Sequence, residues 1–309
     1  MLVTACANLG ARDFGVSDRG GSTLSEQTAG DSQLWSDRVA ARAVRSRRVA
    51  EAHFTFEQTN NPDEIMLSMK SYDPLHTAVV LDGPGGSDEL VLNRTTVEQR
   101  DFYVRNRESG NFVAAEVFTS IGSDWYGFVH LIVTGEAVSS GERGDMEVIG
   151  LLPSTIDEDT IAGEMGWTRP ASARPLGPGV PYHRVAIAHV HAQWLDLVRG
   201  MDARGLSELY SDNVLGALRD YPADQHAPLT GRTAVQDHYA SLFLRYRIID
   251  LDVVLRLVED WYLLAELRWE LEDGDRNRFV HRTADIMVLD DEHRIRRHIG
   301  YGTDFHPLD

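Results

Sequence analysis

Apolar residues in the second half of the chain recur first with a helical period and later with a strand period. A set spaced three or four residues apart predicts one long amphipathic helix, and its members are Ile187, Val190, Trp194, Val198 and Met201. Shorter helices are predicted around residues 206–210 and 235–244. Between residues 261 and 271 two sets of side chains alternate with a period of two, which predicts a strand. Further strands are predicted over 279–289 and 295–301.

This order of elements, helices first and strands last, sets the expected fold class. Asp290 and Asp291 separate the last two predicted strands and are typical turn residues. Strands joined by short turns form antiparallel meanders, and their apolar face must be covered by another layer. The sequence therefore predicts an α+β fold in which the helices pack on one face of a curved antiparallel sheet.

The first half of the chain repeats this pattern. The segment from Val49 to His53 matches Val185 to His189, and Asp124-Trp-Tyr matches Asp260-Trp-Tyr, both 136 residues later. Asp82 precedes Arg94 by twelve residues, as Asp220 precedes Arg232. A repeat this long indicates a duplicated domain, because solenoid repeats are much shorter.

Breaks in the pattern suggest the domain limits. Residues 1–35 are rich in Gly, Ser, Asp and Thr and predict a disordered tail. Residues 36–169 form the first predicted domain and residues 184–309 the second. Four of the eleven prolines fall between Pro170 and Pro181, which predicts a linker over 170–183 because proline interrupts both helices and central strands.

Charge and composition exclude several classes of function. The chain has 30 Lys and Arg against 48 Asp and Glu, a net charge of −18 that argues against nucleic-acid and membrane-surface binding. It lacks the long apolar run of a membrane-spanning helix. A single cysteine, Cys6, excludes an internal disulfide and fits a reducing, cytoplasmic location. We find no glycine-rich phosphate-binding motif and no His-x-x-x-His pair, so we expect neither a cofactor nor a metal.

The second half carries further features of a known superfamily. Asp220 precedes a turn, Gly231-Arg232-Thr-Ala-Val235 opens a helix, and long strands follow. This arrangement resembles the nuclear transport factor 2-like superfamily, and within it SnoaL-like polyketide cyclases and ketosteroid isomerases. The resemblance covers residues 184–305, and 48–169 mainly through the repeat. It implies two cystatin-like, cone-shaped domains, each with an apolar pocket, that pack as an intramolecular pseudo-dimer; homo-oligomers occur among such proteins.

The same resemblance implies a range of functions. Its members include isomerases, cyclases, dehydratases, which are lyases, and epoxide hydrolases, so the expected function is cofactor-independent acid–base catalysis on a small apolar cyclic or polyketide-like molecule. A non-catalytic small-molecule-binding or assembly module is the alternative. The second domain is the better candidate for catalysis.

Two aspartates are the leading catalytic candidates. By resemblance to the isomerases, Asp220 occupies the place of the aspartate that transfers the proton, and Asp285 the place of a protonated, hydrogen-bond-donating aspartate. An apolar pocket raises the pKa of a carboxyl group and so suits either role. The alternatives are a turn aspartate for Asp220 and, for Asp285, solvent exposure or pairing with Arg282 or His281.

Aromatic residues and one histidine complete the predicted site. His189 matches His53 in the repeat and is a candidate general base, although a core hydrogen bond would equally explain a histidine there. Trp194 occupies the place of a pocket tyrosine in the isomerases. Together with Trp194, we expect Tyr221, Tyr239 and Trp269 to contact the substrate.

Two further hypotheses concern the long strands. Arg268 and Glu270 resemble the Arg-x-Asp motif of limonene-type epoxide hydrolases and would be catalytic if they faced the pocket; otherwise Glu266, Arg268 and Glu270 form a solvent-exposed face. The strand over 125–132 is apolar on both sides, which predicts that its outer face meets the sheet of the second domain. His130 matches Glu266 in the repeat, so these two side chains are predicted to pair across a pseudo-twofold axis.

Overall fold

The computed structural model describes residues 26–82, 88–155, 159–171, 181–220, 225–259 and 261–308. Within these ranges, the side chains of residues 26–35, 181–183, 219–220 and 225–227 lie outside the description. The chain divides into two units, Met1–Arg38 and Val39–Asp309, and the second unit holds the sheets of both predicted domains.

The first domain consists of three helices and a six-stranded sheet. Its elements are, in chain order, α1 (Glu26–Glu57), α2 (Pro62–Met66), β1 (Thr77–Asp82), β2 (Asp88–Asn93), α3 (Thr96–Ser109), β3 (Gly110–Gly122), β4 (Tyr126–Ala137), β5 (Arg143–Pro153) and β6 (Met165–Pro170). The strand order is β2-β1-β6-β5-β4-β3. Neighbouring strands are antiparallel except β1 and β6, which are parallel.

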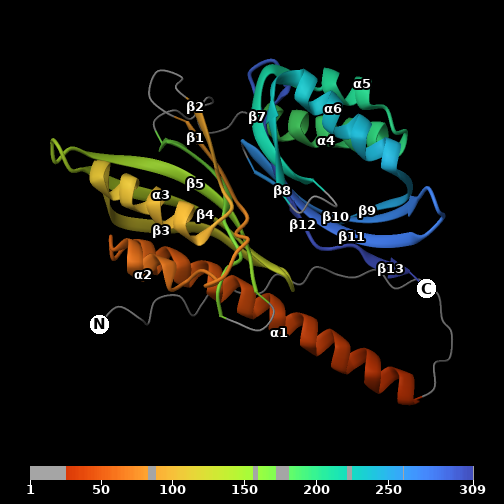
Figure 1. Ribbon diagram of the computed structural model, residues 1–309, viewed down its shortest axis with the longest axis horizontal. Coiled ribbons are helices and arrows are strands. Elements are labelled where there is room, and N and C mark those ends of the chain that lie inside the picture. The colour runs from red at the N-terminus through yellow and green to blue at the C-terminus, as the bar shows by residue number, and fades with distance from the viewer. Residues whose placement is uncertain are drawn as a thin grey trace. The chain divides into compact units, whose positions relative to one another are not determined.

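The second domain repeats this arrangement (Figure 1). Its elements are α4 (Pro181–Arg199), α5 (Ala203–Glu208), β7 (Tyr210–Asp220), β8 (Gln225–Thr230), α6 (Gly231–Arg245), β9 (Tyr246–Val258), β10 (Tyr262–Asp273), β11 (Arg278–Leu289), β12 (Ile295–Gly302) and the short β13 (His306–Leu308). The strand order is β8-β7-β12-β11-β10-β9, with β7 and β12 parallel, and helices α4 to α6 gather on one side of the sheet. The predicted α+β fold with two helix-covered sheets is confirmed.

The limits of these elements can be compared with the predicted segments. Helix α1 begins at Glu26, inside the predicted tail of residues 1–35, and residues 1–25 lie outside the described part. Strand β6 ends at Pro170 and α4 begins at Pro181; residues 172–180 of the predicted linker are again outside it. Among the described helices, none combines the length and the apolar character needed to cross a membrane.

The core of the second domain lies between its helices and the inner face of β10. The apolar side of α4, including Trp194 and Val198, packs in one cluster with Leu263, Ala265 and Leu267. These strand residues are two positions apart, so the side chains share one face of the sheet. The period-two pattern therefore correctly indicated the face that meets the helices.

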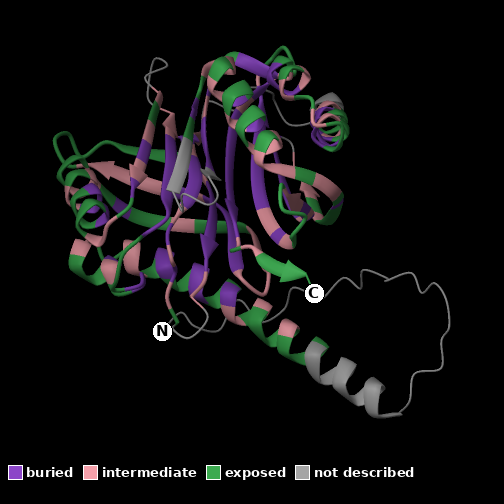
Figure 2. Ribbon diagram, turned by 45° about the vertical axis from the view of Figure 1, so that its right-hand side comes forward, coloured by how far each residue is buried: buried purple, intermediate pink, exposed green. Residues whose placement is uncertain are grey.

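The opposite face of each sheet is also buried. Tyr126 and Phe128 of β4 share an apolar cluster with Tyr262 and Leu264 of β10, and all four are inaccessible to solvent. Figure 2 shows the buried residues running along the strands of both sheets. The prediction that the strand over 125–132 is covered by the second domain is confirmed.

The predicted pairing of His130 with Glu266 is wrong. The His130 Nε2 atom lies 3.0 Å from Glu147, and its Nδ1 lies 3.3 Å from the hydroxyl group of Tyr262. Glu266 instead accepts a hydrogen bond from Tyr126 at 3.1 Å. A pseudo-twofold axis that passes between Phe128 and Leu264 explains both contacts. The residue two positions after Phe128 then meets the residue two positions before Leu264, and the converse pair meets on the other side of the axis.

Glu266 also departs from the predicted solvent-exposed face. It is buried between the sheets, where the indole N–H of Trp125 and the guanidinium group of Arg282 donate to its carboxylate. A buried carboxylate is stable only with such partners. The period-two alternation along β10 was therefore predicted correctly, but the face that carries Glu266 packs against the first domain.

Candidate functional site

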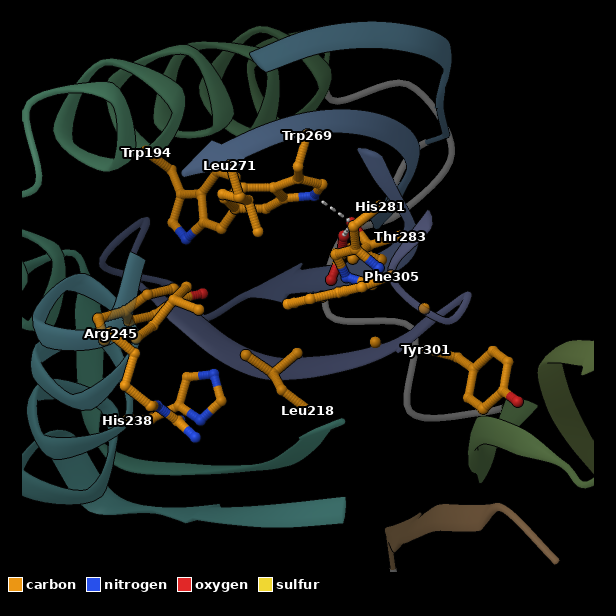
Figure 3. Close-up of a pocket in the computed structure, with 15 residues that line it drawn as sticks. Trp194, Leu218, His238, Arg245, Trp269, Leu271, His281, Thr283, Tyr301 and Phe305 are labelled. Atoms are coloured by element: carbon orange, nitrogen blue, oxygen red, sulfur yellow. Dashed lines mark hydrogen bonds between the residues drawn. The ribbon is translucent and has the colours of Figure 1, made fainter. Parts of the chain in front are cut away.

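Four of the residues predicted to form the site line one cavity in the second domain. Trp194, Tyr239, Trp269 and Asp285 line a partly open cavity of about 60 Å³ between α4, α6 and the sheet. Figure 3 shows the two indole rings on one side of this cavity, with Leu271 between them. The walls are largely apolar, and Asp285 is 4% exposed.

The other predicted residues lie elsewhere. Asp220 ends β7, where its backbone pairs with Gln225, but its side chain is outside the described part of the structure, as is all of Tyr221. His189 lies on the exposed side of α4 and does not line the cavity. Asp220, Tyr221 and His189 therefore remain predictions without a described contact to the site.

The epoxide-hydrolase hypothesis does not fit the cavity. Neither Arg268 nor Glu270 lines it. The Arg268 side chain lies 3.7 Å from Asp252 of the neighbouring edge strand, and Glu270 pairs with Arg278. The Arg-x-Glu motif is therefore engaged in ion pairs away from the pocket.

Helix phase explains why His189 and His53 differ. His53 is fully buried whereas His189 is exposed, so the two are not equivalent. The next helix in each domain is capped by Asn61 and by Asp202, 141 residues apart. Counting back from these caps, His53 corresponds to Trp194. The sequence match at 136 residues misaligned the first helices by more than one turn.

One chain of hydrogen bonds reaches Asp285 through a histidine. The indole N–H of Trp194 donates to the Tyr210 hydroxyl group at 3.1 Å, and that hydroxyl group lies 2.7 Å from Nδ1 of His298. An indole can only donate, so the hydroxyl hydrogen of Tyr210 is free to point at Nδ1. Neutral His298 then carries its proton on Nε2, which lies 3.2 Å from Oδ1 of Asp285.

A second chain reaches the other oxygen of the same carboxylate. The indole N–H of Trp269 donates to Thr283 at 3.0 Å, and the Thr283 hydroxyl group donates to Oδ2 of Asp285 at 2.7 Å. Asp285 therefore accepts a hydrogen bond on both oxygens, which is the arrangement of an ionised carboxylate. The resemblance implied a protonated donor at this place, whereas these contacts suit a proton acceptor.

Glycine at position 300 gives this carboxylate its space. Gly300 pairs with Asp285 across the β11–β12 ladder. A Cβ atom at position 300 would lie 2.3 Å from Oδ1 of Asp285, closer than any allowed contact. In the first domain, Gly150 pairs with Val129 as Asp285 pairs with Ala265. The counterpart of Asp285 is therefore Gly150, and not an acid.

Burial favours the neutral forms of Tyr239 and His191. Burial raises the pKa of Tyr239 well above its usual value, and the neighbouring hydroxyl group of Tyr210 raises it further. Burial lowers the pKa of His191, which stacks on Trp194, to about 4. The cavity walls thus hold the Asp285 carboxylate and the Tyr239 phenol, and His238, Arg245 and His281 also line them (Figure 3).

Sequence reasoning missed three members of this network. Thr283 could have been found, since it precedes Asp285 by two residues and shares its face of the strand. Tyr210 and His298 lie 88 residues apart and meet only because β7 and β12 pair in parallel. No local pattern signals that contact.

Solved structures with a similar fold include three relevant proteins. A steroid delta-isomerase from Pseudomonas aeruginosa is 19% identical, with 38% of this chain and 80% of that one covered and a TM-score of 0.30. An epoxide hydrolase/cyclase-like enzyme in pyran ring formation in the polyether salinomycin is 15% identical, with 38% and 90% covered and a TM-score of 0.32. A protein with a ketosteroid isomerase-like fold from Catenulispora acidiphila, in complex with trimethylamine, is 12% identical, with 36% and 83% covered and a TM-score of 0.33.

The likeness concerns the fold. Each of these three comparisons covers little more than a third of this chain. No protein-family model and no curated protein matches the sequence.

Proposed function

We propose that the second domain catalyses proton transfer on a small, largely apolar molecule that carries a carbonyl group or an epoxide. The observation that carries this proposal is the convergence of two directed hydrogen-bond chains on Asp285 at the wall of an apolar cavity. Asp285 would remove a proton from the substrate, and the phenol group of Tyr239 would donate a hydrogen bond to the oxygen atom that gains negative charge.

This division of roles follows from what each group can do. A carboxylate held by two donors keeps one orientation, so it does not need to reorganise when the substrate arrives. The Tyr239 phenol stays protonated because burial raises its pKa, which leaves it available as a donor. Return of the proton to another carbon would isomerise the substrate, and loss of a β-hydroxyl group would dehydrate it.

The cavity limits which part of a substrate it holds. A volume of about 60 Å³ accommodates a group of a few heavy atoms. Trp194, Trp269, Leu271 and Phe305 supply apolar contact surface around it. We therefore expect the reacting end of a cyclic or polyketide-like ketone to reach Asp285 while the remainder lies outside.

The test is turnover by an Asp285→Asn variant. Cyclic enones, β-hydroxy ketones and epoxides are incubated with the full chain, and products are followed by mass spectrometry and by exchange of substrate hydrogen with deuterated water. We expect the variant to turn over the best substrate at least ~100-fold more slowly, the usual contribution of a general base. Asp275→Asn, in the exposed β10–β11 turn, is the matched control and should keep native rates.

Two results would contradict the proposal. Native turnover by a folded Asp285→Asn protein would remove Asp285 from the mechanism. Tight binding of these compounds without turnover or hydrogen exchange in the native protein would favour the alternative, a non-catalytic binding module.

A further inference from the structure

The first domain contains a larger, partly open cavity than the second, and different side chains line it. Its volume is about 770 Å³, and its walls include Phe54, Phe102 and Phe112. Glu57, Tyr103 and Glu164 also line it. An apolar chamber with a few convergent polar groups is the usual form of a small-molecule site.

Two of the carboxylates that line this cavity, Glu57 and Glu164, converge with the fully buried His53. His53 and Glu57 lie one turn apart on α1, and Glu164 immediately precedes β6. The His53 Nε2 atom is 2.6 Å from Oε1 of Glu164 and 3.6 Å from Oε1 of Glu57. One ligand atom from each of these residues lies within 4.8 Å of the other two.

The opposite nitrogen of His53 is fixed by a separate partner. Nδ1 lies 2.7 Å from the hydroxyl oxygen of Ser68, and that hydroxyl group donates its own hydrogen to the carbonyl oxygen of Ile65 at 2.6 Å. The oxygen can therefore only accept from Nδ1–H. In the neutral imidazole this leaves the lone pair on Nε2, facing the two carboxylates.

The carboxylates are held in the same way, through their other oxygens. Oε2 of Glu164 accepts from the Tyr103 hydroxyl group at 2.7 Å and from the Gln99 amide at 2.8 Å. Asn93 donates to the Gln99 carbonyl oxygen at 2.8 Å, which fixes the orientation of that amide. Oε2 of Glu57 lies 3.6 Å from Arg107. Metal sites characteristically use such outer partners to orient their ligands.

We propose that His53, Glu57 and Glu164 bind a divalent transition-metal ion of the Zn²⁺ type, with its open coordination positions facing the large cavity. Two carboxylates and a neutral imidazole carry a charge of −2, which matches the ion, and this ligand set suits Zn²⁺. Ligand atoms around tetrahedral Zn²⁺ stand about 3.4 Å apart. The Nε2–Oε1 separation of 2.6 Å would therefore widen by less than 1 Å on binding.

The open positions define the class of ligand that the first domain would take. A water molecule or the carbonyl or hydroxyl oxygen of an otherwise apolar molecule would complete the coordination. The chemistry would differ from that proposed for the second domain, in which side chains alone transfer the proton.

A proton on Nε2 of His53 would compete with the metal ion for the same nitrogen. Burial lowers the pKa of His53, but the charges and hydrogen bonds of Glu164 and Glu57 outweigh this effect and raise it to about 9. The competing interpretation is an ion pair that stabilises the domain and binds no metal. A direct titration with metal separates the two.

The experiment uses the full chain, stripped with a chelator and titrated with Zn²⁺ by isothermal calorimetry. We expect one strong site per chain, and at least ~100-fold weaker binding in Glu57→Gln, which removes one ligand at the partly exposed edge of the cluster. Ser68→Ala should weaken binding by ~10-fold, the usual effect of an outer partner. His306→Gln, on an exposed strand, should leave the affinity unchanged.

X-ray absorption at the zinc edge supplies the second readout, with one imidazole and oxygen ligands expected and loss of the imidazole signal in His53→Gln. Absence of a strong site, or equal affinity in the native protein and Glu57→Gln, would overturn the proposal and leave the ion pair. Asp285→Asn should bind Zn²⁺ as the native protein does, so this test and that of the second domain fail independently.

Discussion

His191 shows how a single buried residue couples the second domain to pH. Its ring stacks on Trp194 with the centroids 6.0 Å apart, and neither nitrogen has a hydrogen-bond partner among the described residues. Burial is the main reason that its pKa falls to about 4, and the nearby charge of Asp285 opposes this shift only in part. The folded protein therefore holds this ring neutral.

The consequence is a loss of stability in mild acid. Between pH 6.5 and 4 the unfolded chain binds a proton at His191 that the folded chain rejects, so stability falls as pH falls through this window. At pH 5 the loss should be about 2 kcal/mol. His191→Phe should remove this part of the pH dependence in urea unfolding measured at pH 7 and pH 5. The exposed His189→Phe should retain it; an unchanged pH dependence in His191→Phe would contradict this account.

Periodicity predicted single residues only where one element decides their position. The helical spacing along α4 put Trp194 on its apolar side, and the alternation along β10 put Trp269 on the core face, whereas Asp285 was predicted from the resemblance alone; all three line the pocket. The matching of His189 with His53 was wrong because a short sequence match cannot fix the phase of a helix. Glu164 escaped notice because the residues that meet it, His53 and Tyr103, are 111 and 61 positions away.

At the scale of elements, the two copies begin equivalent helices in different ways. Helix α3 starts with a capping box, in which Thr95 accepts from the backbone of Glu98 and the Glu98 side chain accepts from the backbone of Thr95. Helix α6 starts after Thr230, whose side chain makes no capping hydrogen bond in the described structure.

This difference predicts unequal costs for the same substitution. Thr95→Ala should lower the free energy of unfolding by about 1 kcal/mol, because the backbone N–H of Glu98 loses its acceptor. Thr230→Ala should lower the free energy of unfolding by only a few tenths of a kcal/mol, about a third of that effect or less. Chemical denaturation of both variants at pH 7 measures the contrast, and equal losses would show that the capping box does not stabilise α3.

The strands show which elements a sequence reveals. Those over 261–271, 279–289 and 295–301 were predicted nearly to their ends because they combine apolar alternation with clear turns. Strand β7 was missed, since it follows α5 without a turn signal, and so was the edge strand β9, which is half exposed. By strand register, Glu164 is at the position of the first copy that corresponds to His298 in the second, and by distance from the helix ends Tyr103 corresponds to Tyr239. Both copies therefore build their polar networks at the same positions.

At the scale of the whole molecule, a buried charge cluster joins the sheets. Glu147 pairs with Arg169 at 2.7 Å and His130 at 3.0 Å, and Trp261 of the second domain donates to it at 2.9 Å. Burial raises the pKa of Glu147, but His130 and Arg169 outweigh this and lower it to about 2. Its stabilising contribution is complete above pH 4.5 and disappears as pH falls toward 2.

Removing this carboxylate should therefore affect the whole molecule. Glu147→Gln leaves Arg169 buried without its counter-charge and should cost about 3 kcal/mol at pH 7. The variant should also lose the part of the acid sensitivity that falls between pH 4.5 and 2. Unfolding curves for native protein, Glu147→Gln and Glu147→Gln/Arg169→Met test this, with partial recovery expected in the double variant. A native-like curve for Glu147→Gln would show that the pair contributes nothing.

The pseudo-twofold contact has a consequence for how the two copies can diverge. In strand register, Glu147 lies opposite Ile132 in the first sheet, and Arg282 lies opposite Arg268 in the second. Glu147 and Arg282 are therefore at equivalent positions of the two sheets but carry opposite charges. In a dimer of two identical subunits, both of these positions would carry the same charge, and every substitution would occur in both subunits. In a single polypeptide, a substitution in one domain leaves the sequence of the other domain unchanged, and the covalent link holds the two domains together. The chemistry of one cavity can therefore change without a change in the other cavity, which is impossible in a homodimer.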